Sequence, residues 1–506
     1  MANKSNLFNK FRQRLVEISH INSALTVLGW DEQVNMPARG STGRGATTAY
    51  LAGLAHEKAV SKEFEEMLSA LVVQMNAGEL SAEESCVVRE VARDFEKQKK
   101  LPKEFIEESA RLTSEAHHVW VRARQDSDFN SFAPYLKKIV ELKRRKAQIL
   151  GFKKSPYDAL LDLYEPGATV DEISPVLEEV KVFLMAFTDK IKKSSVKINS
   201  GILSGNFPIE EQKKFTAQIA EKIGFGFDRG RLDVSTHPFS TSFHPEDVRI
   251  TTRYKDNDLF GYGILSTIHE VGHALYEQGL LKEHFGTPLG EAASLGIHES
   301  QSRMWENLVG KSRVFWRYFY PRIQEIFPEP FGAISLEDFY RALNCVGSSL
   351  IRTEADEVTY NLHVILRYEI EKELIEGSIG IEDLPAIWNS KMGQYLGIEV
   401  PSDSLGVLQD VHWSGGSIGY FPTYTLGNLY SAQFYGAAKR DILNLEEEIA
   451  SGHFGNLLSW LRKNIHIHGR LYSADELVQR ATGEKLSSKY FIDYITQKYS
   501  EIYRLD

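Results

Sequence analysis

Two histidines four positions apart, His269 and His273, stand in the chain with Glu270 directly after the first. On a helix, residues four apart lie on one face, so both imidazoles can converge on a single cation. Glu270 can then reach a water molecule beside that cation. This H-E-x-x-H pattern is typical of zinc-dependent peptidases, and it predicts metal-assisted hydrolysis, most often of a peptide bond.

A buried helix over about 259–279, here called the metal helix, is expected to position these residues. Its apolar side chains recur at spacings of three and four, and Gly279 can end it. Those apolar residues are Ile264, Leu265, Ile268, Val271, Ala274 and Leu275. The other interpretation is a surface helix whose two histidines are solvated. The apolar pattern favours burial, and buried histidines need polar partners, which a metal ion can supply.

The third metal ligand is expected on a second helix over about 291–308, which carries Glu299. A catalytic zinc site has three protein ligands and one position open to water. In glutamate-type zincins, a carboxylate on the helix after H-E-x-x-H is the usual third ligand. The neighbouring His298 is the alternative. Glu306 follows on the same face, where it either supports a ligating histidine or forms an ordinary helical salt bridge.

Composition indicates a soluble globular protein and argues against several classes of function. The chain has 506 residues, of which 42% are hydrophobic and 25% charged, and its net charge is −10. Negative charge without long Lys/Arg runs argues against nucleic-acid binding. We expect no membrane span and no secretory signal, because no segment is sufficiently long and apolar. The two cysteines, Cys86 and Cys345, are expected to be reduced thiols in a cytoplasmic protein.

Helical periodicity dominates the chain and predicts one large, mainly α domain with two lobes and a cleft. The helices are expected at about 5–29, 43–60, 62–77, 81–99, 103–126, 129–150, 172–194 and 210–223, and again after 334. Two short strands are expected at 231–235 and 248–254, where β-branched and polar residues alternate just before the metal helix. They form either a plain hairpin or an edge that pairs with an extended substrate.

An ordered series of motifs resembles the carboxypeptidase Taq family of metallocarboxypeptidases. Besides the metal helix, the series contains His237-Pro238-Phe239, Asp247-Val-Arg249-Ile-Thr251, His298-Glu299-Ser300-Gln301, Ile351-Arg352-Thr-Glu354-Ala355-Asp356 and Gly406-Val-Leu-Gln409-Asp410-Val-His412-Trp413. No metal ligand or base is substituted. A match of all these motifs in order is far more specific than any one of them.

The resemblance implies a large helical fold of the glutamate-type zincin class, with a deep cleft and a small β-sheet next to the metal helix. All of residues 1–506 would form one catalytic domain, with N-terminal helices of about 1–125 roofing the cleft and the metal site within 265–300. The resemblance also implies a homodimer and a Zn²⁺ cofactor that Co²⁺ can replace. The implied activity is release of single amino acids from peptide C-termini with broad specificity.

The chemistry can be assigned to residues on this basis. His269, His273 and Glu299 would hold the metal, and Glu270 would be the general base that takes a proton from the attacking water. A nearby cation favours the ionised form that this base needs.

The oxyanion of the tetrahedral intermediate needs a further donor. By the same resemblance, His412 and Tyr420 are the expected donors, with Tyr424 as the reserve. The alternative is that the tyrosines pack in a helical core with their hydroxyl groups satisfied locally.

The free C-terminal carboxylate of a peptide substrate needs a cationic partner, and a guanidinium binds it with two parallel hydrogen bonds. Arg352 is the expected residue, on a helix within one of the motifs, and Arg249 and Arg253 are alternatives. Arg352 otherwise forms a structural salt bridge, for example with Asp356. His237 is expected among the substrate-binding residues as well.

Other functions fit the same pattern of residues. An endopeptidase or a dipeptidyl carboxypeptidase can share the fold, since a metal site does not fix the position of cleavage. The products from a long peptide separate these activities. An inactive helical binding scaffold is disfavoured because Glu270 and all three expected ligands are present.

Overall fold

The protein is mainly helical, as the sequence predicts. A computed structural model describes residues 2–505, with 69% of the chain in helices and 4% in strands. The chain divides into two compact units. The first contains the described residues up to Glu96, Gly201–Tyr340 and Phe434–Lys485, and the second contains Lys97–Ser200, Arg341–Gln433 and the described residues from Leu486. The assignment of the whole chain to one catalytic domain stays a prediction.

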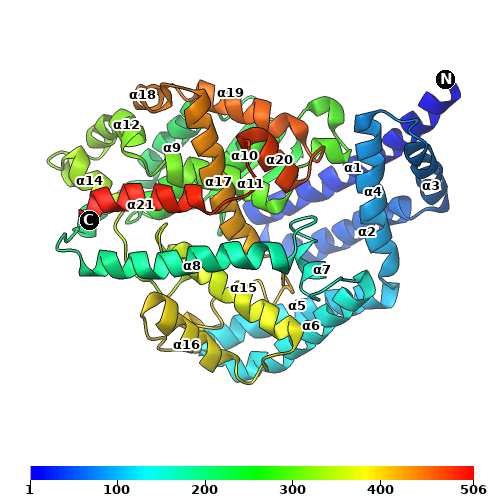
Figure 1. The fold of residues 1–506 in the computed structure, drawn as a ribbon, viewed down its shortest axis with the longest axis horizontal. Coiled ribbons are helices and arrows are strands. Elements are labelled where there is room, and N and C mark those ends of the chain that lie inside the picture. The colour runs from blue at the N-terminus through cyan, green and yellow to red at the C-terminus, as the bar shows by residue number, and fades with distance from the viewer. Residues whose placement is uncertain (1, 506) are drawn as a thin grey trace. The chain divides into compact units, whose positions relative to one another are not determined.

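Helices α1 to α4 form the N-terminal part of the first unit (Figure 1). The helices of this unit are α1 (Ala2–Val34), α2 (Ser41–Ala59), α3 (Lys62–Asn76), α4 (Ala82–Lys100), α9 (Ile209–Ile223), α10 (Ser266–Glu277), α11 (Leu295–Arg303), α12 (Arg313–Ile326), α13 (Pro328–Phe331), α14 (Leu336–Leu343), α17 (Pro422–Asp441), α18 (Leu445–Ala450), α19 (Gly455–Asn464) and α20 (Ala474–Thr482). Of these, α4 and α14 continue along the chain into the second unit, whereas α17 begins in the second unit and continues into the first.

The second unit is built from helices of comparable length. They are α5 (Lys103–Asp126), α6 (Phe129–Leu150), α7 (Asp158–Leu161), α8 (Val170–Lys193), α15 (Tyr360–Glu376), α16 (Leu384–Leu396) and α21 (Lys489–Tyr503). Short 3-10 turns in the chain are η1 (Ala38–Gly40), η2 (Ser200–Leu203), η4 (Lys282–His284), η5 (Pro288–Gly290), η7 (Arg352–Glu354), η8 (Asp403–Leu405) and η9 (His466–His468). Across residues 2–505, no helix has the length and apolar character that a bilayer crossing requires.

Local sequence signals explain several helix ends. The side chain of Asp128 accepts a hydrogen bond from the Ser131 amide and so caps α6. Ser127, just before it, has a left-handed φ of 55°, which ends α5. Thr169 and Glu172 form a reciprocal capping box at the start of α8. These caps account for the agreement between expected and observed boundaries in this part of the chain.

The small sheet has three strands, one more than the sequence predicts. β1 (Gly230–Val234), β3 (Asp247–Thr252) and β2 (Phe239–His244) lie in that order. β1 pairs with β3 in parallel, and β2 pairs with β3 in antiparallel fashion. Of the two alternatives for the predicted strands, the plain hairpin is therefore wrong, and the pairing of an edge with substrate stays a prediction. β2 escaped prediction because its centre is a run of Ser and Thr with little apolar alternation.

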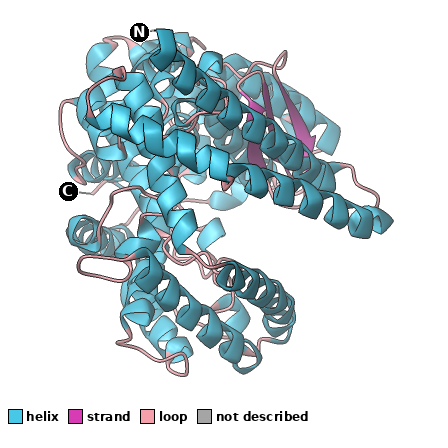
Figure 2. Cartoon of the chain, turned by 90° about the vertical axis from the view of Figure 1, so that its right-hand side faces the viewer, coloured by secondary structure: helices cyan, strands magenta, loops and turns pink. Residues whose placement is uncertain are grey.

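The sheet, whose strands are magenta in Figure 2, lies in the first unit. Its strands β2 and β3 contact the metal helix α10, as expected. The central strand β3 carries the fully buried Val248 and Ile250 and packs against α10. Helix α1 covers β2, where Ser23 Oγ donates to the Phe243 carbonyl at 2.8 Å. The metal helix thus rests on a buried strand.

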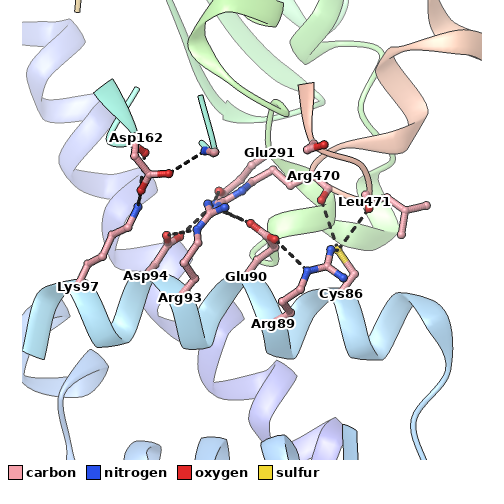
Figure 3. A network of polar contacts seen from close by, with 12 residues as sticks. Cys86, Arg89, Glu90, Arg93, Asp94, Lys97, Asp162, Glu291, Arg470 and Leu471 are labelled. Carbon is pink, nitrogen blue, oxygen red and sulfur yellow. Dashed lines mark hydrogen bonds and ion pairs between the residues drawn. The ribbon is translucent and has the colours of Figure 1, made fainter. Parts of the chain in front are cut away.

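A network of charges around Arg470 ties α4 to the chain just before α11 (Figure 3). The Arg470 guanidinium donates to Glu90 at 3.0 Å, to Asp94 at 3.1 Å and to Glu291 at 3.0 Å. The Cys86 thiol donates to the Arg470 carbonyl at 3.3 Å. Burial raises the pKa of this thiol, which is free, as is Cys345.

Candidate active site

The H-E-x-x-H residues lie on α10, which continues directly from a π-helical segment, η3 (Leu259–Leu265). Spacing of four places His269, His273 and Glu277 in one row along a face of the helix. Its other faces are buried among apolar residues, as the sequence predicts. Those residues are Ile264, Ile268, Val271, Ala274 and Leu275.

Gly272 allows α11 to approach α10 closely. A Cβ atom at this position would lie 2.5 Å from Ser302 Cα and 2.7 Å from the Gln301 carbonyl oxygen. These neighbours are backbone atoms, so a larger residue would push the helices apart. The close contact brings Glu299 of α11 to the histidines of α10.

Donor atoms from three residues converge between the two helices. Glu299 Oε2 lies 3.4 Å from His273 Nε2 and 3.9 Å from His269 Nε2. One ligand atom of each residue lies within 4.8 Å of the other two. This group contains Glu299 rather than His298. Two imidazole nitrogens and one carboxylate oxygen form a donor set typical of catalytic zinc.

The outer nitrogen of each imidazole has a partner. His269 Nδ1 lies 2.8 Å from Glu306 Oε2, a contact that the sequence predicts as one of two alternatives. His273 Nδ1 lies 2.6 Å from His298 Nδ1, and His298 Nε2 lies 2.9 Å from Glu277 Oε1. Such partners fix the orientation of a ligating ring and leave the Nε2 lone pair for an ion.

Arg303 bridges the two carboxylates of this region. Its Nε donates to Glu299 Oε1 at 2.7 Å, and its Nη1 donates to Glu306 Oε2 at 3.3 Å. Burial favours the neutral acids, but Arg303 and His269 outweigh it. The pKa of Glu299 therefore lies well below its usual range, and that of Glu306 falls to about 2. Both acids are ionised at neutral pH.

The two histidines are shifted in opposite directions. Burial lowers the pKa of His273 to about 4. Burial also opposes protonation of His269, but Glu299 and Glu306 outweigh it and raise the pKa of this ring. His273 is therefore neutral at neutral pH, whereas His269 holds a proton more readily than a free imidazole does, and a cation at this ring competes with that proton.

Glu270 has no hydrogen bond or ion pair with the residues that the structure describes, although it is only 7% exposed. Burial raises its pKa to about 7, and Glu299 acts in the same direction while His269 opposes the shift. A cation bound nearby lowers the pKa of a carboxyl group. This acid is thus free to exchange a proton with a molecule next to the converging donors.

A second cluster of buried charges lies in the second unit around Asp410. Arg352 donates through Nε and Nη2 to Asp410 Oδ1 at 3.1 and 2.9 Å, and through Nη1 to Tyr360 Oη at 3.1 Å. Arg367 pairs with the other oxygen of Asp410 and donates to Gln409 Oε1 at 2.7 Å. Two guanidinium groups share one carboxylate, so the three side chains carry one surplus positive charge.

Arg352 does not lie on a regular helix, and that prediction is wrong. It is the first residue of the 3-10 turn η7. The Asp356 side chain accepts the backbone N–H groups of Val358 and Thr359, and the regular helix α15 begins only after these residues. The salt-bridge partner of Arg352 is Asp410 rather than Asp356. Its side chain is 7% exposed. Three of the five N–H groups of the guanidinium have the partners given above, and the other two have no hydrogen-bond acceptor among the described residues.

His412 and the two tyrosines come together in the same unit. His412 Nε2 lies 3.2 Å from Tyr424 Oη, and the rings of His412 and Tyr420 are 5.5 Å apart. Burial lowers the pKa of His412 to about 4, with Arg352 acting in the same direction. The ring is therefore neutral at neutral pH and has one N–H to donate.

The remaining predicted substrate-binding residues belong to the first unit. Arg249 already donates through Nε and Nη2 to the two oxygens of Asp247 at 2.9 Å, and its guanidinium lies 4.3 Å from the Trp30 ring centre. Arg253 lies over a tyrosine ring. His237 is exposed in the turn before β2.

Comparison with known proteins decides the family. The family model described as Carboxypeptidase Taq (M32) metallopeptidase matches residues 10–499. The chain belongs to this family. Thermostable carboxypeptidase 1 of Thermus thermophilus is 43% identical over 97% of this chain and 98% of its own length. Carboxypeptidase 1 of Bacillus subtilis is 39% identical, covering 98% of both chains.

Solved structures agree with this membership of the carboxypeptidase Taq family. The M32 carboxypeptidase from Deinococcus radiodurans R1 superposes with a TM-score of 0.95 at 38% identity, covering 99% of this chain and 100% of that one. The protein is accordingly a metallopeptidase with carboxypeptidase activity.

The residues of this carboxypeptidase fit the divalent ion that a metallopeptidase requires. Two nitrogen atoms and one oxygen atom converge, and the outer nitrogen of each imidazole already has a partner. The carboxylates Glu299 and Glu306 have one guanidinium, Arg303, between them. The surplus of negative charge favours a bound cation.

The family motifs do not include several residues that hold the site together. Arg303 and Glu277 were missed, although each follows a predicted ligand by four positions and so shares its helix face. That spacing could have identified both. Arg367 gave no such signal, because its contact with Asp410 depends on the fold of the second unit.

Proposed function

We propose that this carboxypeptidase is zinc-dependent and releases single amino acids from peptide C-termini with broad side-chain specificity. The observation that carries the proposal is the convergence of His269 Nε2, His273 Nε2 and Glu299 Oε2 next to an unpartnered Glu270. These three residues would hold Zn²⁺, and Co²⁺ could replace it. The bound ion would polarise the scissile carbonyl and lower the pKa of water.

Glu270 is proposed as the general base. Its carboxylate would accept the proton of the attacking water and deliver it to the amine of the leaving amino acid. The absence of hydrogen bonds to described residues supports this role, because both oxygens stay available. Glu306 and His298 would keep the imidazoles oriented during the reaction.

His412 and Tyr420 are proposed as donors to the oxyanion of the tetrahedral intermediate, with Tyr424 as the reserve. The neutral state of His412 supports the role, since an uncharged ring still has one N–H to donate and needs no buried positive charge. Tyr424 supports His412 through the contact between its hydroxyl and Nε2.

Arg352 is proposed to bind the terminal carboxylate of the substrate. The surplus positive charge around Asp410 and the two remaining N–H groups of Arg352 support this assignment. Arg367 is completely buried, which makes it the less accessible of the pair. Arg249 is the weaker alternative because Asp247 already occupies it. His237, exposed before β2, stays a proposed contact for the substrate.

Digestion of a long peptide by metal-loaded protein tests the proposed function. We expect mass spectrometry to show a ladder of single-residue losses from the C-terminus. A chelator should abolish the ladder, and Zn²⁺ or Co²⁺ should restore it. Internal fragments or losses of dipeptides would contradict the exopeptidase activity. Full activity with almost no bound metal would contradict the metal site.

We further propose that the enzyme is a cytoplasmic homodimer that acts on peptides and binds neither nucleic acid nor membranes. The free thiols of Cys86 and Cys345 are consistent with a reducing compartment, and the net charge of −10 disfavours nucleic acid. Light scattering should give twice the mass of one chain, and cell fractionation tests the location.

A further inference from the structure

The segment 412–420, here called the donor loop, carries both proposed oxyanion donors, His412 and Tyr420, and has no regular secondary structure. Its backbone turns at Gly416 and Gly419, where φ is 70° and 97°. Its internal hydrogen bonds are few, such as Ser417 N–H to the His412 carbonyl at 2.8 Å. A loop of this kind depends on outside contacts to hold its side chains in place.

One buried carboxylate supplies such contacts at both ends of the donor loop. Glu371, on α15, is 0% exposed. Its Oε1 accepts from Trp413 Nε1 at 2.8 Å, and its Oε2 accepts from the Gly419 amide at 2.9 Å. Trp413 directly follows His412, and Gly419 directly precedes Tyr420. A single side chain therefore fixes the residue next to each proposed donor.

The loop is seated on a rigid neighbour as well. Tyr157 Oη donates to Glu371 Oε2 at 2.8 Å. A Cβ atom on Gly419 would lie 2.8 Å from the Leu160 carbonyl group, so the backbones touch there. The ring of Tyr164 meets the ring of Tyr420 edge-on at 5.3 Å. The segment around 157–164 and α15 thus hold the loop between them.

Burial of the Glu371 carboxyl group costs free energy, which a purely structural position would not require. It has no ion pair with any residue between 2 and 505, and its three hydrogen-bond partners are uncharged. Burial raises the pKa of Glu371 to about 7, although the Gly419, Tyr157 and Trp413 donors and Arg367 oppose the shift. An apolar residue would avoid the cost of desolvating a carboxyl group. A carboxylate is needed here because the donors of Tyr157, Trp413 and Gly419 all point to this position and require an acceptor.

We propose that Glu371 is a positioning residue that holds both ends of the donor loop and thereby fixes the orientation of His412 and Tyr420, the proposed oxyanion donors. The proposal rests on the oxyanion role given to those two residues. Glu371 would then contribute to turnover without contact with the metal ligands or the substrate.

Glu371→Gln is the sharpest variant because it keeps the size of the side chain. Whichever oxygen becomes an NH₂ group then faces the N–H of Trp413 or of Gly419, and neither can accept a hydrogen bond. We expect kcat to fall roughly 10- to 100-fold, as when a reacting group is misplaced by about 1 Å. KM for a free-acid peptide and metal content should change little. Trp413→Phe, which removes one donor, should give a smaller loss.

A double-mutant cycle with Tyr420→Phe separates positioning from general damage. If Glu371 acts through the loop, the combined variant should lose far less kcat than the product of the two single losses. Glu357→Gln is the matched control. That acid is also buried in the second unit, but it pairs with Lys498 at 2.9 Å and holds α21. It should lower the unfolding temperature without changing kcat per folded molecule.

Two results would overturn the proposal. The first is a Glu371→Gln enzyme with a lower unfolding temperature but wild-type kcat, and the second is a cycle in which the losses multiply. Both leave the oxyanion assignment intact if Tyr420→Phe alone is slow. If Tyr420→Phe and His412→Asn are both as active as the wild type, the oxyanion assignment is wrong. The positioning role of Glu371, which rests on that assignment, is then wrong as well.

Discussion

The two clusters of buried charge carry surpluses of opposite sign. In the first unit, Glu299 and Glu306 share the single guanidinium of Arg303. In the second unit, two guanidinium groups share the carboxylate of Asp410. A buried charge without a partner is costly, so each surplus indicates the sign of the group that completes it. Under the proposed function, a cation would complete the first cluster and the terminal carboxylate of a peptide would complete the second.

The clusters also differ in where their polar atoms point. Around His269 and His273, the outer nitrogens are bonded while the inner ones face each other and Glu299. Around Asp410, the donors converge on an acceptor that is already present. Lone pairs without a bonded partner can bind a cation directly. The ion pair with Asp410 instead holds a guanidinium group in the orientation in which it can bind an anion. The first cluster is therefore tested by its metal and the second by the end group of the substrate.

The largest effect is expected from Glu270→Gln, which should lower kcat roughly 10²- to 10⁴-fold because the water loses its proton acceptor. Metal content should stay at the wild-type level, since the proposed ligands are untouched. Glu299→Ala is the matched variant and should lose metal. Turnover and metal stoichiometry measured on the same samples check both statements. Loss of metal from Glu270→Gln but not from Glu299→Ala would reverse the two roles.

Arg352→Ala tests the surplus positive charge of the second cluster. The specificity constant for free-acid peptides should fall about 10- to 100-fold, the loss expected for a charge-assisted bidentate contact. Amidated peptides, which the wild type cleaves poorly, should be affected much less. Arg249→Ala serves as the control, because Asp247 occupies that arginine. A preference for free acids that survives in Arg352→Ala would move the role to Arg249 or Arg253.

Arg303→Gln tests the first cluster without touching a proposed ligand. The variant removes the donor that holds Glu299 and Glu306, and metal affinity should fall about tenfold. Competition with a chromogenic chelator measures the change. Arg322→Gln, an exposed arginine paired with Glu325, should leave the affinity unchanged. Wild-type affinity in Arg303→Gln would show that the ligands need no such support.

The smallest effect concerns stability and pH. Burial lowers the pKa of His363, on α15, to about 3, well below the value of about 6.5 in an unfolded chain. The unfolded chain binds more protons in this window, so stability is complete above pH 6.5 and falls as the pH drops toward 3. The slope is at most about 1.4 kcal/mol per pH unit for one histidine. Denaturant unfolding of His363→Leu should show a shallower dependence; an unchanged slope would contradict the assignment.

The sequence predicts the helices well because their cause is local. Apolar spacing and caps such as Asp128 act within a few residues. The parallel pairing of β1 with β3 depends on contacts across a connection that contains another strand, and β2 lacks apolar alternation, so both escaped prediction. The π-helical segment η6 (Met304–Val309), which carries Glu306, also has no sequence signal that we identified.

The same distinction applies to the site. Spacing alone proposes His269, His273 and Glu270, because a helix fixes which residues share a face. Glu299 was proposed because glutamate-type zincins usually take their third ligand from the next helix, with His298 as the alternative. The partner of Arg352 could not be found this way. Asp410 lies far along the chain on an irregular segment, and only the folded second unit brings it to both arginines.

The backbone contact at Gly272 has a consequence for ionic size. No layer of side chains separates α10 from α11 at this point, so main-chain atoms set the distance between the helices. Repulsion between atoms in contact keeps the helices from moving closer, and the close packing around them resists their separation, so the distance from the histidines to Glu299 varies little. We expect the site to favour ions with bonds of about 2.0–2.2 Å to nitrogen and oxygen. Calcium, which needs about 2.3–2.6 Å and more ligands, should bind poorly even in excess.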